Sequence, residues 1–262
     1  MRSNRVRQLW QAGSPIITGW CSTPDPYTTE VMVRAGFDAL VLDMQHGMAI
    51  GPDRAAQWLQ IVGQTDTTPI VRIPWNEPAY VQWVLDAGAM GVIVPMVNNL
   101  DEAKKAIGAC RYPPLGYRSS GPNRTRLYNG LDYFDHANSE VICLVMMETV
   151  EGIEAINTIS ELPGLDGYYL GPSDLAVSMG LKPGFDVKDP RHVAAAQKVA
   201  DVARNRRQIA GIHAGTIEEA LRRHQQGYHL IPVCNDIWLL SAGIADNLRQ
   251  YREGISADHG NS

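Results

Sequence analysis

The chain has 262 residues, of which 45% are hydrophobic, and this is enough to bury the core of one large domain. Its formal net charge of −5, with no basic run that carries interleaved aromatic residues, argues against a nucleic acid partner. No apolar stretch approaches the roughly 18 to 20 residues that span a bilayer, and residues 1–13 lack the apolar centre of a signal peptide, so we expect a cytoplasmic protein that binds no membrane.

Short apolar runs with the composition of β-strands alternate with longer helical patterns along the chain. The runs are Pro15 to Cys21, Asp38 to Met44, Thr68 to Ile73, Gly91 to Val97, Val141 to Met147, Gly167 to Gly171, Ile209 to Ala214 and His229 to Cys234. Such alternation is typical of strand-helix-strand units around a parallel sheet. Eight units in about 250 residues predict an α/β fold, a (β/α)₈ TIM barrel in a single domain over 1–262, and an open doubly wound sheet is the alternative.

Several predicted helices have recognisable ends. Thr28 and Thr29 precede one helical pattern, and Thr216 precedes another, with Glu219 three residues later as in a capping box. Glycine in the left-handed region closes a helix without strain. Four helices are expected to end in this way, at Gly36, Gly88, Gly164 and Gly227.

Residues Arg111 to Ser139 interrupt the alternation, because they are rich in proline and glycine and show no sustained period. We expect one long loop there. Compact domains seldom carry so long an irregular connection unless it binds something or covers a site.

The four cysteines are scattered, with no CxxC pair and no histidine spaced for a zinc site: Cys21, Cys110, Cys143 and Cys234. This spacing indicates neither a disulfide framework nor a structural metal, and buried free thiols are expected instead.

Two acidic residues follow predicted strands that are neighbours in the sequence. Glu148 follows the strand that ends at Met147, and Asp174 follows the strand that ends at Gly171. A helix over Thr149 to Leu162 joins these strands, so a parallel crossover brings both carboxylates to the same end of the sheet. Two such oxygen ligands suit Mg²⁺ or Mn²⁺ and leave positions open for water and a chelating substrate. Each acid could instead cap the helix beside it, and the pattern favours neither interpretation.

His46 stands at a strand end beside Asp43 and could act as a general base, although a lone histidine is more often structural or exposed. Arg72 lies within an apolar strand, where a guanidinium is costly to bury unless it meets an anion or an oxyanion. A structural ion pair with Asp43 or Asp86 is the alternative for Arg72. Asp86 itself ends a helix, where an acid opposes the helix dipole, so we expect it to have another partner.

The turn Gly171-Pro172-Ser173-Asp174 begins with a glycine, which lets a ligand approach the main chain. The backbone N–H groups of Ser173 and Asp174 could then hold a carboxylate, and an ordinary tight turn is the alternative. His213 and Asn235 end the seventh and eighth strands and would face the mouth of the barrel. Each is a candidate substrate contact, or a polar residue that only holds a loop.

With these residues in place, nearly the whole chain resembles the HpcH/HpaI aldolase family, the metal-dependent class II pyruvate aldolases. The segments that carry the resemblance are Leu42 to Gly47, Val71 to Asn76, Val94 to Val97, Arg111 to Arg118, Met147 to Thr149 and Gly171 to Leu175. The predicted strand ends offer no lysine for a Schiff base, which agrees with a metal-dependent mechanism.

The resemblance implies roles for these residues. Glu148 and Asp174 would bind a divalent cation (Mg²⁺, Mn²⁺ or Co²⁺), which chelates a 2-oxo acid. His46 would transfer a proton, with Asp86 raising its basicity. Arg72 would steady the enolate oxygen, and main-chain groups near Ser173 would hold the substrate carboxylate. The resemblance also implies a homo-oligomer, a hexamer built as a trimer of dimers, in which the C-terminal helix (about 236–254) is often exchanged between subunits.

The chain departs from many family members at positions that surround the substrate. Gln45 stands where many have glutamate, and Met146, a substrate contact in some, stands where many have glutamine. His213 and Asn235 replace apolar residues of the best-known branch. These changes leave the metal and enolate chemistry intact but put the aldehyde partner in doubt, and a hydroxylated nucleophile such as hydroxypyruvate is conceivable.

We therefore hypothesise a class II aldolase that reversibly cleaves a 4-hydroxy-2-oxo acid to pyruvate, or an analogue, and an aldehyde through a metal-stabilised enolate. One alternative is an oxaloacetate decarboxylase or an acyl-CoA lyase of the same superfamily. No basic or glycine-rich segment clearly offers a groove for the CoA nucleotide. A barrel that only binds a 2-oxo acid is the remaining alternative.

Overall fold

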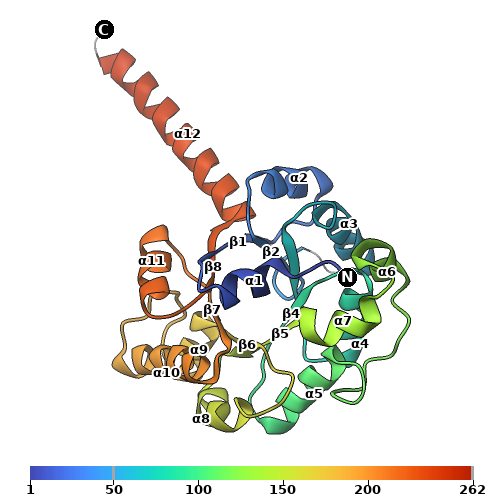
Figure 1. Cartoon of the computed structure of the whole chain (residues 1–262). Helices are drawn as coiled ribbons and strands as arrows, with labels where there is room; N and C mark the ends of the chain where they lie inside the picture. Colours follow the sequence, from blue (N-terminus) through green and yellow to red (C-terminus); the bar gives the residue numbers. More distant parts are fainter. Residues whose placement is uncertain (49–50, 261–262) are drawn as a thin grey trace.

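The computed structural model describes residues 1–48 and 51–260, and within these ranges the chain forms eight strands and twelve helices. All neighbouring strands pair in parallel in the order β1 to β8, and β8 pairs with β1, so the sheet closes into a barrel (Figure 1). The strands are β1 (Ile16–Cys21), β2 (Ala39–Asp43), β3 (Thr68–Arg72), β4 (Gly91–Val94), β5 (Ile142–Met147), β6 (Gly167–Leu170), β7 (Ile209–Ile212) and β8 (Leu230–Asn235). The predicted (β/α)₈ barrel is confirmed, and the open sheet is excluded.

Most of the helices surround this barrel, as the strand-helix alternation predicts (Figure 1). They are α1 (Arg5–Gln11), α2 (Pro26–Arg34), α3 (Pro52–Val62), α4 (Pro78–Asp86), α5 (Leu100–Cys110), α6 (Asn123–Asn129), α7 (Tyr133–Glu140), α8 (Val150–Ile159), α9 (Pro172–Ser178), α10 (Pro190–Arg206), α11 (Ile217–Gln225) and α12 (Asp236–Gly260). In the part of the chain that the structure describes, no helix is long and apolar enough to cross a membrane.

The strands are buried on both faces, which explains why they read as continuous apolar runs instead of alternating ones. One cluster of buried side chains, which includes Trp20, Ile93 and Tyr169, fills the barrel interior. A second cluster, which includes Trp58 and Val145, packs between the sheet and the helices. Every strand therefore contributes side chains to two cores, although Ile17 of β1 and Val233 of β8 are exposed.

Helix ends follow the predicted chemistry in most places. Thr216 caps α11 by accepting a hydrogen bond from the backbone N–H of Glu219 at 3.1 Å. The prediction for α2 was wrong: Asp25 caps it and Pro26 occupies its first turn, before the two threonines. Aspartate before proline is the stronger start signal, because proline is pre-organised for the first turn. Gly36, Gly88 and Gly227 have positive φ and directly follow the C-caps of α2, α4 and α11, as predicted. The prediction for Gly164 was wrong: its φ is positive, but α8 already ends at Ile159 with Ser160 as its C-cap, so Gly164 lies in the loop before β6.

The prediction of one irregular loop over Arg111 to Ser139 was also wrong, because α6 and most of α7 lie within it. The segment joins the end of α5 to the start of β5, so it lies at the amino-terminal end of the strands. None of the residues that line the main cavity belongs to it. It packs against the barrel through buried Arg118, which pairs with Asp86 at 2.7 Å and stacks on Tyr112 and Tyr133.

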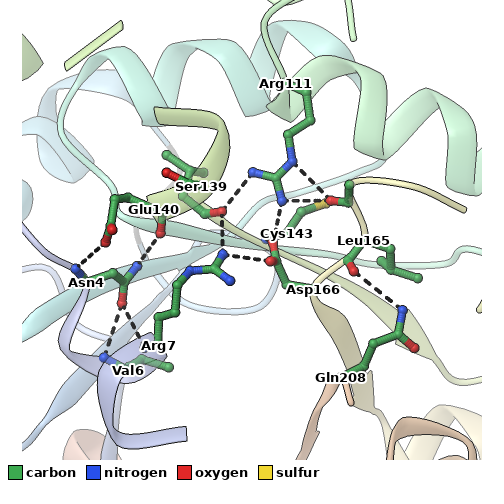
Figure 2. A network of polar contacts seen from close by, with 12 residues as sticks. Asn4, Val6, Arg7, Arg111, Ser139, Glu140, Cys143, Leu165, Asp166 and Gln208 are labelled. Atoms are coloured by element: carbon green, nitrogen blue, oxygen red, sulfur yellow. Dashed lines mark hydrogen bonds and ion pairs between the residues drawn. The ribbon is translucent and has the colours of Figure 1, made fainter. Parts of the chain in front are cut away.

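A network of polar contacts closes the amino-terminal end of the barrel (Figure 2). Asp166, just before β6, accepts from Arg7 of α1 at 2.6 Å and also pairs with Arg111. Arg111 also donates to the backbone carbonyls of Gly164 and Val141, at 2.7 Å each. This buried cation is therefore fully partnered, and it ties α5 to the loops before β5 and β6.

The cysteines are free, as predicted, and three are buried while Cys234 is partly exposed. Helix α12 begins where the predicted C-terminal helix does and extends to Gly260. Figure 1 shows it leaving the barrel after β8 and projecting away from the other elements.

Candidate active site

A cavity of about 550 Å³ opens at the carboxyl ends of the strands. This is the end at which barrel enzymes place their chemistry. Ten of the residues predicted as site residues line it: Asp43, His46, Arg72, Met146, Gly171, Pro172, Ser173, Asp174, His213 and Asn235. The fold thus gathers side chains from six strand ends into one hollow.

An ion pair between Arg72 and Asp43 crosses from β3 to β2. The two residues are register partners, and Arg72 donates from Nε at 3.0 Å and from Nη2 at 2.5 Å to the two carboxylate oxygens. Burial alone would raise the pKa of Asp43, but the hydrogen bonds and the charge of Arg72 outweigh it and hold this pKa below its ordinary value. Trp20 adds an indole N–H bond to Asp43 at 3.2 Å, and the Arg72 guanidinium lies 4.9 Å from the Trp20 ring centroid. The pair therefore fixes a cation at the cavity wall.

Asp43 also shapes the loop that carries His46. Its Oδ1 accepts from the backbone N–H of Gln45 at 3.0 Å and of His46 at 3.1 Å. Through these bonds the carboxylate turns the chain directly after β2, so that the exposed His46 side chain lines the cavity. Asp43 is thus a positioning residue for both Arg72 and His46.

Glu148 lies directly after β5 and is 1% exposed. Its Oε1 accepts from the backbone N–H of Met96 at 2.6 Å, and Met96 holds the left-handed conformation (φ 53°) that a non-glycine residue seldom adopts. Its Oε2 is buried without a hydrogen-bond partner. Burial, and then the charge of Asp174, raises the pKa of Glu148 to about 7. One oxygen of this carboxylate therefore lacks a partner that a cation would supply.

The helix-cap alternative for the two acids is not supported for Glu148. Thr149 caps α8 by accepting from the N–H of Gly152, and Glu148 contacts another loop instead. Asp174 lies in the first turn of α9. The residue before this helix is Gly171, which has no side chain to cap it. A Cβ at Gly171 would lie 2.5 Å from Glu148 Oε2, so only glycine lets the turn approach this carboxylate.

A divalent cation fits these residues. Two carboxylates, one with a buried unpartnered oxygen, provide hard oxygen donors beside an open cavity. Over residues 1–48 and 51–260 there is no group of three or more His, Cys, Asp or Glu side chains that could hold a metal ion. Glu148 and Asp174 would thus be the protein ligands, with the other positions left to water and substrate oxygens.

The first turn of α9 is held from behind by a residue that the sequence did not indicate. His192 of α10 is fully buried, and its Nε2 donates to the backbone carbonyl of Pro172 at 2.9 Å. The N–H groups of Ser173 and Asp174 lie in the first turn, so they have no acceptor within the helix. Their binding of a substrate carboxylate stays a prediction.

His213 and Asn235 have different surroundings. The Tyr169 hydroxyl lies 3.2 Å from His213 Nδ1, and burial lowers the pKa of His213 to about 4, with a further contribution from Arg72. Asn235 donates to Ser22 Oγ at 2.9 Å and accepts from the N–H of Ile237 and of Trp238 at the start of α12. Asn235 therefore caps α12 in addition to lining the cavity.

Asp86 is not brought to the cavity within one chain. It ends α4 on the amino-terminal side of the barrel and pairs with Arg118 at 2.7 Å. The expectation that it has another partner is confirmed. Its action on His46 stays a prediction that requires a second subunit.

Several cavity residues were not predicted. The aromatic ones are Trp20, Tyr169, Phe185 and Trp238. Trp20 and Tyr169 lie in strands whose alternate residues face the barrel interior, so the register of those strands could have identified them. Phe185 lies in a loop and Trp238 on α12, and no pattern in the sequence marks either one.

The chain is similar to known proteins over most of its length. The family model described as HpcH/HpaI aldolase/citrate lyase matches residues 17–241. A hydroxypyruvate/pyruvate aldolase of Rhizorhabdus wittichii is 35% identical over 239 residues, which cover 91% of this chain and 95% of that protein. A 4-hydroxy-2-oxo-heptane-1,7-dioate aldolase of Klebsiella pneumoniae is 33% identical over 244 residues, with coverage of 92% and 91%.

Among solved structures, a HpcH/HpaI aldolase/citrate lyase family protein from Burkholderia cenocepacia superposes with a TM-score of 0.88. It is 28% identical, and the match covers 95% of this chain and all of that chain.

Proposed function

The chain belongs to the HpcH/HpaI aldolase/citrate lyase family, and we propose that it is a carbon–carbon lyase: a metal-dependent aldolase that cleaves 4-hydroxy-2-oxo acids to pyruvate, or an analogue such as hydroxypyruvate, and an aldehyde. The observation that carries the proposal is the buried Glu148 carboxylate with one unpartnered oxygen beside Asp174, in reach of the cavity that Arg72 and His46 line.

Glu148 and Asp174 would hold a divalent cation, which when bound acts as a Lewis acid for the carboxylate and keto oxygens of a 2-oxo acid. The N–H groups of Ser173 and Asp174 would orient the substrate carboxylate at the start of α9. These contacts would put the C3 carbon of the acid in the cavity, where bond cleavage or proton loss would leave negative charge on the keto oxygen.

Arg72 supports the proposal because its positively charged guanidinium is held in position before the reaction begins. Its bidentate pair with Asp43 holds the guanidinium at the cavity wall, so that little reorganisation accompanies the growth of charge on the substrate. Lysine could not reproduce this two-point geometry.

His46 is the proposed proton carrier. It lies on the loop that Asp43 fixes, its side chain lines the cavity, and a histidine can accept and return a proton near neutral pH. In cleavage it would take the proton from the 4-hydroxyl group as the C3–C4 bond breaks and the aldehyde forms, and it would then give that proton to C3 of the enolate to yield pyruvate; the aldol direction reverses both transfers. We retain Asp86 as a partner of His46 only across a subunit boundary.

A test uses proton exchange at C3 of pyruvate, followed by NMR in D₂O, together with pyruvate release from a panel of 4-hydroxy-2-oxo acids. We expect exchange and release with Mg²⁺, Mn²⁺ or Co²⁺ and loss of both in EDTA. Glu148→Gln and Asp174→Asn should abolish both and also abolish Mn²⁺ binding measured by electron paramagnetic resonance. Glu151→Gln, an exposed acid in the first turn of α8, is the matched control. Activity that survives EDTA unchanged would refute the proposal, and preferred turnover of oxaloacetate or an acyl-CoA would favour the other lyase reactions.

We also propose that the protein is a homo-oligomer in which α12 packs on another copy. Support comes from its separation from the barrel and from its exposed apolar side chains beyond the residues that line the cavity, which are Leu239, Leu240, Ile244, Leu248, Tyr251 and Ile255. An exposed stripe of this size is typical of an interface. Light scattering coupled to size exclusion tests this: the chain is 28.8 kDa, and a mass of one chain would refute it.

A further inference from the structure

Three aromatic rings form one wall of the cavity, here called the aromatic wall: Phe185, His213 and Trp238. Their centroids form a triangle, with 5.1 Å from Phe185 to His213, 5.3 Å from Phe185 to Trp238 and 5.5 Å from His213 to Trp238. Trp20 packs edge-on against His213 at 4.8 Å and extends this surface into the barrel. His213 follows β7, Trp238 lies on α12 after β8, and Phe185 lies in the loop between α9 and α10, so the wall stands next to the ends of β5 and β6 that carry the two metal-binding candidates.

The polar groups of the wall present no positive charge at neutral pH. Burial lowers the pKa of His213 to about 4, and burial keeps Tyr169 protonated by raising its pKa well above 10. The Tyr169 hydroxyl therefore donates to His213 Nδ1, which leaves the proton of the neutral ring on Nε2. His213 is thus a neutral hydrogen-bond donor within an aromatic surface.

The cavity as a whole is also poor in free cations. Among its described lining residues, Arg72 and His46 are the other side chains that can be positive, and Arg72 is already paired with Asp43. Asp43 offsets the charge of Arg72, and Asp174 is the proposed ligand of the divalent cation, so neither acid leaves a free positive charge at the aromatic wall. A second carboxylate of a substrate, placed against the aromatic wall, would lose its hydration without gaining a cation.

We propose that the aromatic wall binds the aldehyde partner and selects uncharged aldehydes with a flat ring over aldehydes that carry a carboxylate. This inference rests on the proposed aldolase function and names the substrate class of the same site. A flat ring gains stacking and edge contacts with Phe185 and Trp238, and His213 Nε2–H can donate to a hydroxyl or carbonyl oxygen on it. The dianionic substrate named for the Klebsiella pneumoniae relative would be a poor match for this wall.

Neighbouring elements hold the wall in place. Arg223 of α11 donates to the backbone carbonyl of Phe185 at 3.5 Å and pairs with buried Glu219, and Arg222 pairs with Asp186 at 2.6 Å. The loop that carries Phe185 is thereby fastened to α11. The cap by Asn235 in turn fixes the first turn of α12, which carries Trp238.

Two matched pairs of aldehydes test the proposal, with pyruvate as the nucleophile and kcat/KM as the readout. 4-Formylbenzamide and 4-formylbenzoate differ in charge but share a ring, and we expect the amide to be preferred by about tenfold or more. Benzaldehyde and cyclohexanecarbaldehyde are both uncharged, and we expect the flat ring to be preferred by about two- to tenfold. Equal turnover within both pairs, or preference for the benzoate, would overturn the proposal.

Substitutions locate the preference. Phe185→Leu should bring the benzaldehyde to cyclohexanecarbaldehyde ratio close to one, whereas Phe134→Leu, which changes an exposed ring in α7, should leave it unaltered. Phe185→Arg should raise the benzoate to amide ratio, because it supplies the missing cation. Ratios between two aldehydes cancel any general loss of activity, and a ratio that Phe185→Leu and Phe185→Arg both leave unchanged would refute the assignment of the wall.

Proton exchange at C3 of pyruvate, measured without aldehyde, separates this inference from the proposed function. Exchange with no discrimination between the paired aldehydes overturns the aromatic wall alone. Absence of exchange with every metal overturns the proposed function and this inference with it.

Discussion

The wild-type protein should lose folding stability as the pH falls from 8 to 5, in part because of His213. The variant His213→Gln should lack this part of the loss. Burial, helped by the charge of Arg72, lowers the pKa of this histidine from 6.5 to about 4. Between these two values the unfolded chain binds a proton that the folded chain does not, so the free energy of unfolding falls as the pH falls. Glutamine keeps a polar side chain at the site but does not titrate.

The magnitude follows from the two pKa values. One pKa unit corresponds to about 1.4 kcal/mol, and at pH 5 the unfolded histidine is almost fully protonated while the folded one is mostly neutral. The wild type should therefore lose about 2 kcal/mol more than His213→Gln between pH 8 and pH 5.

Urea unfolding followed by circular dichroism at both pH values, at one protein concentration, measures this difference. His136→Gln, which changes an exposed histidine in α7, controls for the substitution itself. If wild type and His213→Gln lose the same stability on going from pH 8 to pH 5, His213 is not buried as a neutral ring and the charge argument for the aromatic wall fails.

Three further substitutions test the arrangement of the site and of the opposite end of the barrel. Gly171→Ala places a Cβ 2.5 Å from Glu148 Oε2, so Mn²⁺ affinity should fall by about tenfold or more in a titration, and unchanged affinity would remove Glu148 as a ligand. Arg72→Lys loses the two-point pair with Asp43 and should slow C3 proton exchange by about 10²- to 10³-fold, whereas a wild-type rate would show that the fixed cation is not used. Arg111→Met leaves a buried acid short of a partner and should cost about 3 to 5 kcal/mol in urea unfolding while C3 exchange in the folded enzyme persists, and a cost below about 1 kcal/mol would contradict the network drawn in Figure 2.

The strands and most of the site were predictable because each strand-helix unit has the same local sequence pattern. A strand buried on both faces is a continuous apolar run, so its end is visible in the sequence, and the polar residue that follows, such as Asp43 or Glu148, is placed at the cavity by the fold alone. The register of β2 and β3 then decided between the two ion-pair partners considered for Arg72.

The missed helices and site residues have no periodic hydrophobic pattern in the sequence. Helices α6 and α7 are short, and proline and glycine surround them, so no amphipathic stripe distinguishes them from a loop. Phe185 lines the cavity from a loop that contacts α11 through residues 38 positions apart, and no local pattern reveals such a contact. His192 supports the turn before Asp174 through one buried hydrogen bond, which no local pattern reveals.

Pairing of β8 with β1 has a consequence for how the chain is made. The finished barrel has no free sheet edge, yet β1 ends at Cys21 and its second partner begins at Leu230, so the ribosome must release most of the chain before that edge is covered. Until then the nascent sheet is open on both sides and Arg7 lacks the acid that lies 159 residues further along. Chains truncated before β8 should therefore retain two unpaired strand edges and aggregate. Pairing of β8 with β1 removes these edges and with them the aggregation risk.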